Sequence, residues 1–346
     1  MERVVRSMLE RLHVARSGPA PAVEAYDAYL QALQAYRSLE SGGFQEAVDR
    51  AEAAIALDPS YAPAHALLAQ IVVFLAMGFG WQAPEELMAR ARRAAERAID
   101  MDPGLPEAHM ARGVLLMFHD WRFAEARREL ERAIELGPSL ADPHSWMEFY
   151  WTYVQRDEER ALAANARALA LSPLDPAHRD RRATVLYLFG RYAEAEAAFR
   201  EMLAEGVPGP LPHLGLVDTL GRIGRLDEAL EHVEPMLEMG RGATAALGIG
   251  AAFMGLAGRK ERARELVGEM ERLQERASGS LFWLAVGYAG LGEMDRAFEA
   301  LDRALDARDP GLIYLSVVPR QLGIHDDPRY PRILDRMGLA HLAVPE

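Results

Sequence analysis

The chain has 346 residues, half of them hydrophobic, with a formal net charge of −13 and no cysteine. Without cysteine it can form neither disulfides nor thiolate metal sites, and it has no cysteine nucleophile. The negative charge repels phosphate backbones, and no stretch combines clustered Lys and Arg with aromatic residues, which argues against nucleic acid as a partner. The longest uncharged run, 242–258, is shorter than the roughly 20 residues that span a bilayer, so we expect a buried helix there and no membrane contact.

The first expected element is a short helix at the amino end. Its apolar residues recur at helical spacing, which predicts an amphipathic helix over about 1–14: Val4, Val5, Met8, Leu9 and Leu12. A stretch with two prolines and a glycine, 15–21, then breaks the helix, so we expect residues 1–22 to form a helix and a linker. Because this helix is amphipathic and lacks the uninterrupted apolar core of a signal peptide, we expect a cytoplasmic protein.

A repeated pattern fills most of the remaining chain. In its clearest copy a turn glycine, Gly190, leads into a helix with a small residue, Ala195, near its start. The equivalent residues are Ala47, Ala91, Ala126, Ala161, Ala229, Ala263 and Ala297. Subtracting neighbouring positions along the chain gives spacings of 44, 35, 35, 34, 34, 34 and 34 residues. A fixed period near 34 is the signature of an array of helix-turn-helix repeats.

The pattern predicts one all-α domain of about eight repeats over 23–308, because each repeat buries its apolar face on its neighbours. Small residues let the two helices of a hairpin approach closely, and aromatic side chains fill the wider space between hairpins. Repeats five to eight share a turn glycine: Gly190, Gly224, Gly258 and Gly292. Repeat four has Arg156 at that position and Asn165 in a slot that is apolar or small elsewhere, which predicts a weaker turn.

Repeat two carries ten extra residues around 77–84, where two glycines and a proline indicate a lengthened turn. Insertions in solenoids loop out on one face, which is often the binding face. Trp81 is therefore a candidate partner-binding residue. The alternative is that Phe79 and Trp81 fold back on their own repeat.

Aromatic residues are densest in the segment 118–153. Trp and Tyr combine a large contact area with a polar group, so Trp146, Tyr150 and Tyr153 are candidate anchors for a partner. They could equally belong to the core, although the aromatic residues of this helix cover more than one face. His119, beside the turn of repeat three, is a further candidate contact, and the alternative for it is a local hydrogen bond.

The period stops after Ala304, and residues 309–346 form a tail outside the repeats. Asp327 and Pro328 indicate the start of a last helix, and Gly338 its end. Such a helix would cover the open end of the array, which a solenoid needs.

With its small residues, turn Gly, following aromatic, Ala and closing Pro, the stretch 23–307 resembles a tetratricopeptide repeat (TPR) protein. The segments 54–64 and 327–339 further resemble the carboxy-terminal TPR region of bacterial adenylate cyclases, serine/threonine kinases and winged-helix regulators. The resemblance implies a right-handed superhelical solenoid with terminal capping helices, and a concave groove that binds a peptide or a protein. It supplies no catalytic residue for this chain.

Motifs for chemistry are missing from the sequence. The ten His residues show no metal-binding spacing, and no phosphate-binding Gly-Lys-Ser/Thr sequence is present. Gly248 and Gly250 resemble the start of a dinucleotide loop, but Phe253 stands where the third glycine belongs. Groups of a Ser-His-Asp triad meet only in space, so spacing alone does not decide that case. We expect no cofactor, no metal and no enzymatic activity.

Three functional hypotheses follow. The first is a non-enzymatic adaptor in bacterial signalling that captures a peptide or partner protein, with neutral or basic segments favoured by the charge of −13. The second is self-association as a homodimer, or an intramolecular regulatory role in a larger signalling protein. The third is a small-molecule sensor or hydrolase that uses the groove as a pocket.

Overall fold

A computed structural model describes residues 21–38, 43–78, 85–275 and 279–343. The expected helix over 1–14 and the candidate residue Trp81 lie outside these ranges. Within them every regular element is a helix, and none is long and apolar enough to cross a membrane.

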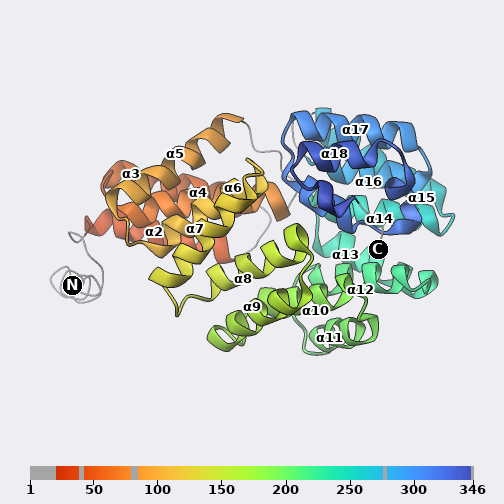
Figure 1. Ribbon diagram of the computed structural model, residues 1–346, viewed down its shortest axis with the longest axis horizontal. Coiled ribbons are helices and arrows are strands. Elements are labelled where there is room, and N and C mark those ends of the chain that lie inside the picture. Colours follow the sequence, from red (N-terminus) through yellow and green to blue (C-terminus); the bar gives the residue numbers. More distant parts are fainter. Residues whose placement is uncertain (1–20, 39–42, 79–84, 276–278, 344–346) are drawn as a thin grey trace. The chain divides into compact units, whose positions relative to one another are not determined.

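The described helices form antiparallel pairs in chain order (Figure 1). The pairs are α2 (Val23–Ser38) with α3 (Gly43–Leu57), α4 (Ala62–Gly78) with α5 (Glu85–Met101), α6 (Pro106–Phe118) with α7 (Phe123–Leu136), α8 (Ala141–Phe149) with α9 (Glu158–Leu171), α10 (Pro176–Leu188) with α11 (Tyr192–Ala204), α12 (Leu211–Arg222) with α13 (Leu226–Met239), α14 (Thr244–Leu256) with α15 (Lys260–Glu275), and α16 (Leu281–Leu291) with α17 (Met294–Asp306). Helix α8 continues into a π-helical segment, η1 (Tyr150–Gln155). The predicted all-α fold of about eight helical hairpins is confirmed.

The chain divides into two compact units. Unit 1 comprises the described residues of 1–75, 83–117 and 122–139, and unit 2 those of 76–82, 118–121 and 140–346. Unit 1 therefore holds most of the first three hairpins, and unit 2 holds the last five together with the tail.

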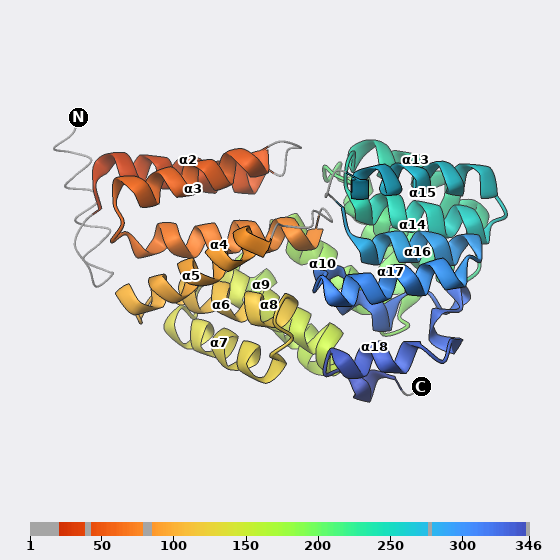
Figure 2. The same ribbon diagram turned by 90° about the horizontal axis from the view of Figure 1, so that it is seen from above.

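The small residue that defines the repeat is an anchor of the core. All eight of these alanines have no exposed surface. The uncharged run 242–258 contains α14, whose side chains are mostly buried, and α14 lies beside α16 in unit 2 (Figure 2). A methyl group added to Gly255 would lie 2.1 Å from the carbonyl oxygen of Gly290, so these two helices approach each other closely because glycine is present.

The hairpin turns share a left-handed residue. The four turn glycines have φ between 76° and 81°, and Trp121 and Arg156 occupy the same position with φ of 54° and 55°. After Gly190, the N–H of Arg191 donates to the carbonyl five residues earlier, at Leu186. After Trp121 and Arg156, the corresponding N–H donates to the carbonyl six residues earlier. One extra residue thus fits before each of these two turns, which explains the two spacings of 35 residues between Ala91 and Ala161.

The tail consists of short helical segments: η2 (Pro310–Val317), η3 (Arg320–Leu322), η4 (Ile324–Asp326), α18 (Tyr330–Arg336) and η5 (Ala340–Leu342). Helix α18 begins two residues after the predicted start, and the Asp327 carboxylate accepts a hydrogen bond from the N–H of Arg329 at 2.9 Å. Arg332 and Arg336 of α18 pair with Asp302 and Asp306 of α17 at 2.7 and 3.1 Å. The predicted terminal helix therefore packs on the last hairpin.

Candidate binding grooves

Residues of η2 lie against the first helices of several hairpins in unit 2. The ring centroid of Tyr314 is 5.1 Å from that of Tyr153 and 5.9 Å from that of Phe149, both in hairpin four. It is also 5.7 Å from Trp283 and 6.4 Å from Phe282, in hairpin eight. One tail residue thus connects the first and last hairpins of unit 2.

Arginine side chains hold the backbone around this segment. Arg222 of α12 donates to the carbonyl of Val317 and, at 3.1 Å, to the hydroxyl of Tyr187. Arg308, just before the segment, donates to the carbonyls of His119 and Asp120 at 3.2 and 3.3 Å. These bonds tie the tail to the same face of unit 2 that carries the aromatic residues.

A buried carboxylate fixes the start of the segment. Asp309 accepts hydrogen bonds from the Ser280 hydroxyl at 2.9 Å, the Phe282 N–H at 3.2 Å and the Gly311 N–H at 2.8 Å. Ser280 is also the N-cap residue of α16, so Asp309 lies where the partial positive charge of that helix favours an anion. Burial nevertheless raises the pKa of Asp309, against these hydrogen bonds.

We call the face of unit 2 that η2 covers, formed by the first helices of its hairpins, the inner face. The burial of the η2 side chains decides whether this face is open to a partner. Leu312, Ile313 and Leu315 of η2 are at most 1% exposed. Burying each stabilises the folded unit by roughly 1.5–3 kcal/mol, or roughly 5–9 kcal/mol together. A micromolar partner supplies about 8 kcal/mol in total. The segment is therefore part of the core of unit 2, and the inner face that it covers is filled.

The sequence-predicted site residues occupy different environments. Tyr150 and Tyr153 are buried, with 4% and 7% of their surface exposed, and the hydroxyl of Tyr150 accepts a hydrogen bond from Gln155 at 3.1 Å. Trp146 is half-buried, and the guanidinium of Arg181 lies 4.8 Å from its ring. Trp146 and Tyr153 share one aromatic cluster through Phe149, whereas the ring of Tyr150 stacks edge-on with that of Trp151.

His119 makes a local hydrogen bond. Its Nδ1 lies 3.1 Å from the carboxylate of Asp120, and its side chain is buried. Tyr314 is the residue of this face that the sequence analysis missed. The available signal was the uncharged run 310–319 directly after the last repeat.

Ionisable groups of the first helices lie near the covered segment. Glu148 is 2% exposed, accepts a hydrogen bond from the Thr152 hydroxyl at 2.8 Å and lies 3.3 Å from Arg181. Burial raises the pKa of Asp180 to about 7, with Arg181 opposing the rise, and burial raises that of Asp218 to about 6. Among the described residues no group of three His, Cys, Asp or Glu side chains could hold a metal ion.

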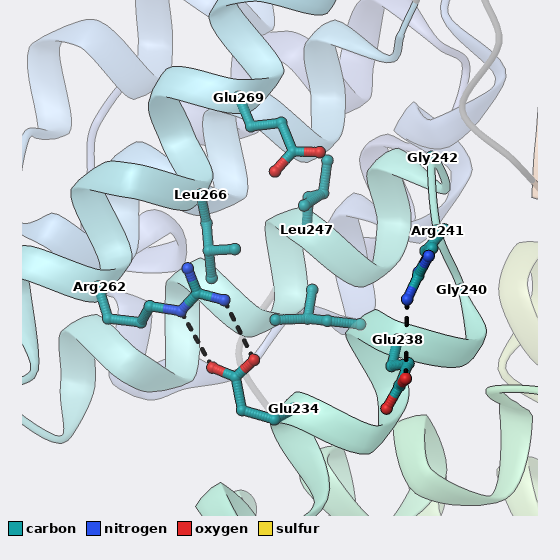
Figure 3. Close-up of a pocket in the computed structure, with 10 residues that line it drawn as sticks. Glu234, Glu238, Gly240, Arg241, Gly242, Leu247, Arg262, Leu266 and Glu269 are labelled. Atoms are coloured by element: carbon teal, nitrogen blue, oxygen red, sulfur yellow. Dashed lines mark hydrogen bonds and ion pairs between the residues drawn. The ribbon is translucent and has the colours of Figure 1, made fainter.

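A second groove lies between α13 and α15, over the start of α14 (Figure 3). We call it the outer groove. Its cavity volume is about 510 Å³. It is lined by Glu234, Leu237, Glu238, Gly240, Arg241, Gly242, Leu247, Arg262, Leu266 and Glu269. Leu247 and Leu266 are almost fully buried, so they form an apolar floor, and the charged side chains form the rim.

Two ion pairs occupy the rim of the outer groove. Arg262 of α15 forms a two-point bond with Glu234 of α13, at 3.0 and 3.1 Å (Figure 3). Arg241 and Glu238 are 3.6 Å apart, but both side chains are more than three-quarters exposed, so this pair contributes little. Helix α13 carries five carboxylates and no Lys or Arg within its sequence LDEALEHVEPMLEM. The α13 side of the groove is therefore acidic.

Comparison with known proteins supports the repeat assignment. The family model of the tetratricopeptide repeat matches residues 88–141 and 153–210. No curated protein matches the chain. A tetratricopeptide repeat protein from Parabacteroides merdae has 15% identity and a TM-score of 0.51, over 75% of this chain and 99% of that one.

Two further solved structures are similar. PilW, a type IV pilus biogenesis factor, has 16% identity and a TM-score of 0.47 over 60% of this chain and 92% of its own. PilF of Pseudomonas aeruginosa has 20% identity and a TM-score of 0.42 over 62% and 91%. At these identities the likeness concerns the fold alone.

Proposed function

We propose that this tetratricopeptide repeat protein is a non-enzymatic module that binds a partner protein. The observation that carries the proposal is the stack of helical hairpins, built on eight fully buried alanines and matched in part by the tetratricopeptide model. Arrays of this kind present extended surfaces on which other proteins dock. The expected cytoplasmic setting and the role in bacterial signalling belong to the proposal and rest on the sequence.

Within this proposal the partner binds outside the inner face of unit 2. Residues 310–318 already cover that face, and Leu312, Ile313 and Leu315 among them are at most 1% exposed. Trp146, Tyr150 and Tyr153 could contact a partner as anchors only if this segment were released. We therefore assign the partner to surfaces that the tail leaves uncovered. The net charge of −13 favours a neutral or basic partner segment.

A second candidate function is intramolecular regulation, and the contacts of Tyr314 with hairpins four and eight favour it. In that case the tail would compete with a partner for the inner face. A homodimer is the related possibility, in which the tail of one copy would occupy the inner face of another.

Affinity capture from a lysate of the source organism tests the proposal. The bait is the full chain, alongside a Trp146→Ala/Tyr150→Ala variant and a Tyr314→Ala variant that remain folded by circular dichroism. We expect a specific partner that binds the wild type and the Trp146→Ala/Tyr150→Ala variant alike. If the purified partner binds no more tightly than roughly millimolar, the binding function fails. Stronger binding to the Tyr314→Ala variant would favour intramolecular regulation.

A further inference from the structure

We propose that the outer groove between α13 and α15 binds a segment of the partner protein that presents a Lys or Arg beside a leucine-sized side chain. The inference rests on the proposed function and adds to it the place of docking and the chemistry of the partner. Two features of the groove support it: its apolar floor and its acidic rim.

The floor can receive an aliphatic side chain. Leu266 is 2% and Leu247 6% exposed, and Leu237 beside them is half-buried. Figure 3 shows Leu247 and Leu266 pointing into the space between the flanking helices. A cavity of about 510 Å³ is of the size that holds a few side chains.

The rim favours a cation over an anion. The charged groups that border the floor are the carboxylates of Glu234, Glu238 and Glu269 and the guanidiniums of Arg241 and Arg262. The carboxylates therefore outnumber the guanidiniums. Arg262 is bound to Glu234 at two points and to Glu265 of α15 at 2.8 Å, so it is already engaged by carboxylates of α13 and α15. Glu238 and Glu269 are exposed, and Glu238 forms a weak pair with Arg241 at 3.6 Å. A partner's Lys or Arg could lay its apolar stem on the leucines and place its charge beside these two carboxylates.

A second copy of this chain is a poorer occupant, because its net charge of −13 repels an acidic rim.

Fluorescence anisotropy with two labelled peptides of equal length tests this assignment on the full chain. One peptide repeats Leu-Leu-Arg and the other repeats Leu-Leu-Glu. The groove variant is Glu238→Gln/Glu269→Gln. The matched control is Glu159→Gln/Glu201→Gln, which makes the same change in net charge at exposed positions of α9 and α11.

We expect the arginine peptide to bind the wild type and the control alike, and to bind the groove variant roughly tenfold more weakly, which corresponds to 1.4 kcal/mol. The glutamate peptide should not bind. A Leu237→Ala variant in α13 should weaken binding of the arginine peptide, whereas Leu174→Ala, at a position 91% exposed between α9 and α10, should not. Equal weakening in the groove and control variants, or no binding to the wild type, would overturn the assignment.

Two further outcomes separate this inference from the proposed function. If the captured natural partner binds the groove variant as tightly as the wild type, the docking site is wrong and the binding function stands. If light scattering shows a dimer that the groove variant dissociates, a second copy occupies the groove and the assignment to a basic partner fails.

Discussion

Arg156 is held in a backbone conformation that suits glycine. Its φ is 55°, its side chain donates to the Leu188 carbonyl at 3.0 Å, and its guanidinium lies 4.7 Å from the ring of Phe189. We expect Arg156→Ala to lower the free energy of unfolding by about 1–2 kcal/mol through these lost contacts. Arg156→Gly should be about 1 kcal/mol more stable than Arg156→Ala, because it relieves the left-handed conformation. Urea denaturation measures both.

Gly190→Ala is the control for this prediction, since a methyl group there would meet no atom within 4 Å and only the φ of 81° opposes it. We expect a loss of about 1 kcal/mol. Equal stabilities for the Ala and Gly variants at 156 would contradict the account of the turn.

The raised pKa of Asp180 predicts that the free energy of unfolding depends on pH. Burial raises its pKa to about 7 in the folded chain, against about 4 in an unfolded one. The folded state therefore binds more protons between these values, and the free energy of unfolding falls as pH rises through that range. Asp180→Asn removes this contribution, so the variant should gain on the wild type by about 4 kcal/mol between pH 4 and pH 8, which is three pKa units at about 1.4 kcal/mol each. Thermal or urea unfolding across pH measures the gain, and a difference independent of pH would contradict it.

For single residues, the sequence predicted the buried alanines of the repeat better than it predicted contacts between side chains. The alanines could be identified because each recurs at one position of a periodic pattern, and each is fully buried. The partners of Tyr153 could not be identified, because Tyr314 lies 161 residues later in a segment without a period. The role of Tyr150 and Tyr153 as groove anchors stays a prediction, because the sequence pattern contains no information on what covers a helix face.

Among the elements, η2 carries the clearest prediction for stability. Leu315 has no exposed surface, and its truncation would leave a cavity among the first helices of unit 2. We expect Leu315→Ala to cost about 2–5 kcal/mol in free energy of unfolding. Leu174→Ala, the matched change at a position 91% exposed, should stay within about 0.5 kcal/mol of the wild type. A small effect at Leu315 would show that the tail does not belong to the core.

The hairpins were predictable because a helical period and a turn residue are local properties, and α18 was predictable from its proline and glycine. The course of η2 was not. An uncharged run after the last repeat is compatible with a cap on the final hairpin, and its contact with hairpin four depends on the curvature of five stacked repeats. Sequence spacing does not report that curvature.

For the molecule as a whole, the division into two compact units predicts separate responses to core mutations. Leu130 of α7 has no exposed surface and belongs to unit 1. We expect Leu130→Ala to speed amide hydrogen exchange in unit 1 by more than tenfold and to leave unit 2 little changed. Leu315→Ala is the reciprocal variant. Equal acceleration throughout the chain by either variant would show that the two units unfold as one.

The central claim is that a partner protein docks on the outer groove while the tail keeps the inner face of unit 2 filled. Hydrogen exchange of the full chain with and without its captured partner tests this most directly. The account predicts new protection in α13 and α15, with unchanged exchange in η1 and in residues 310–318. Protection in η1 together with faster exchange in 310–318 would contradict it, because the partner would then have displaced the tail.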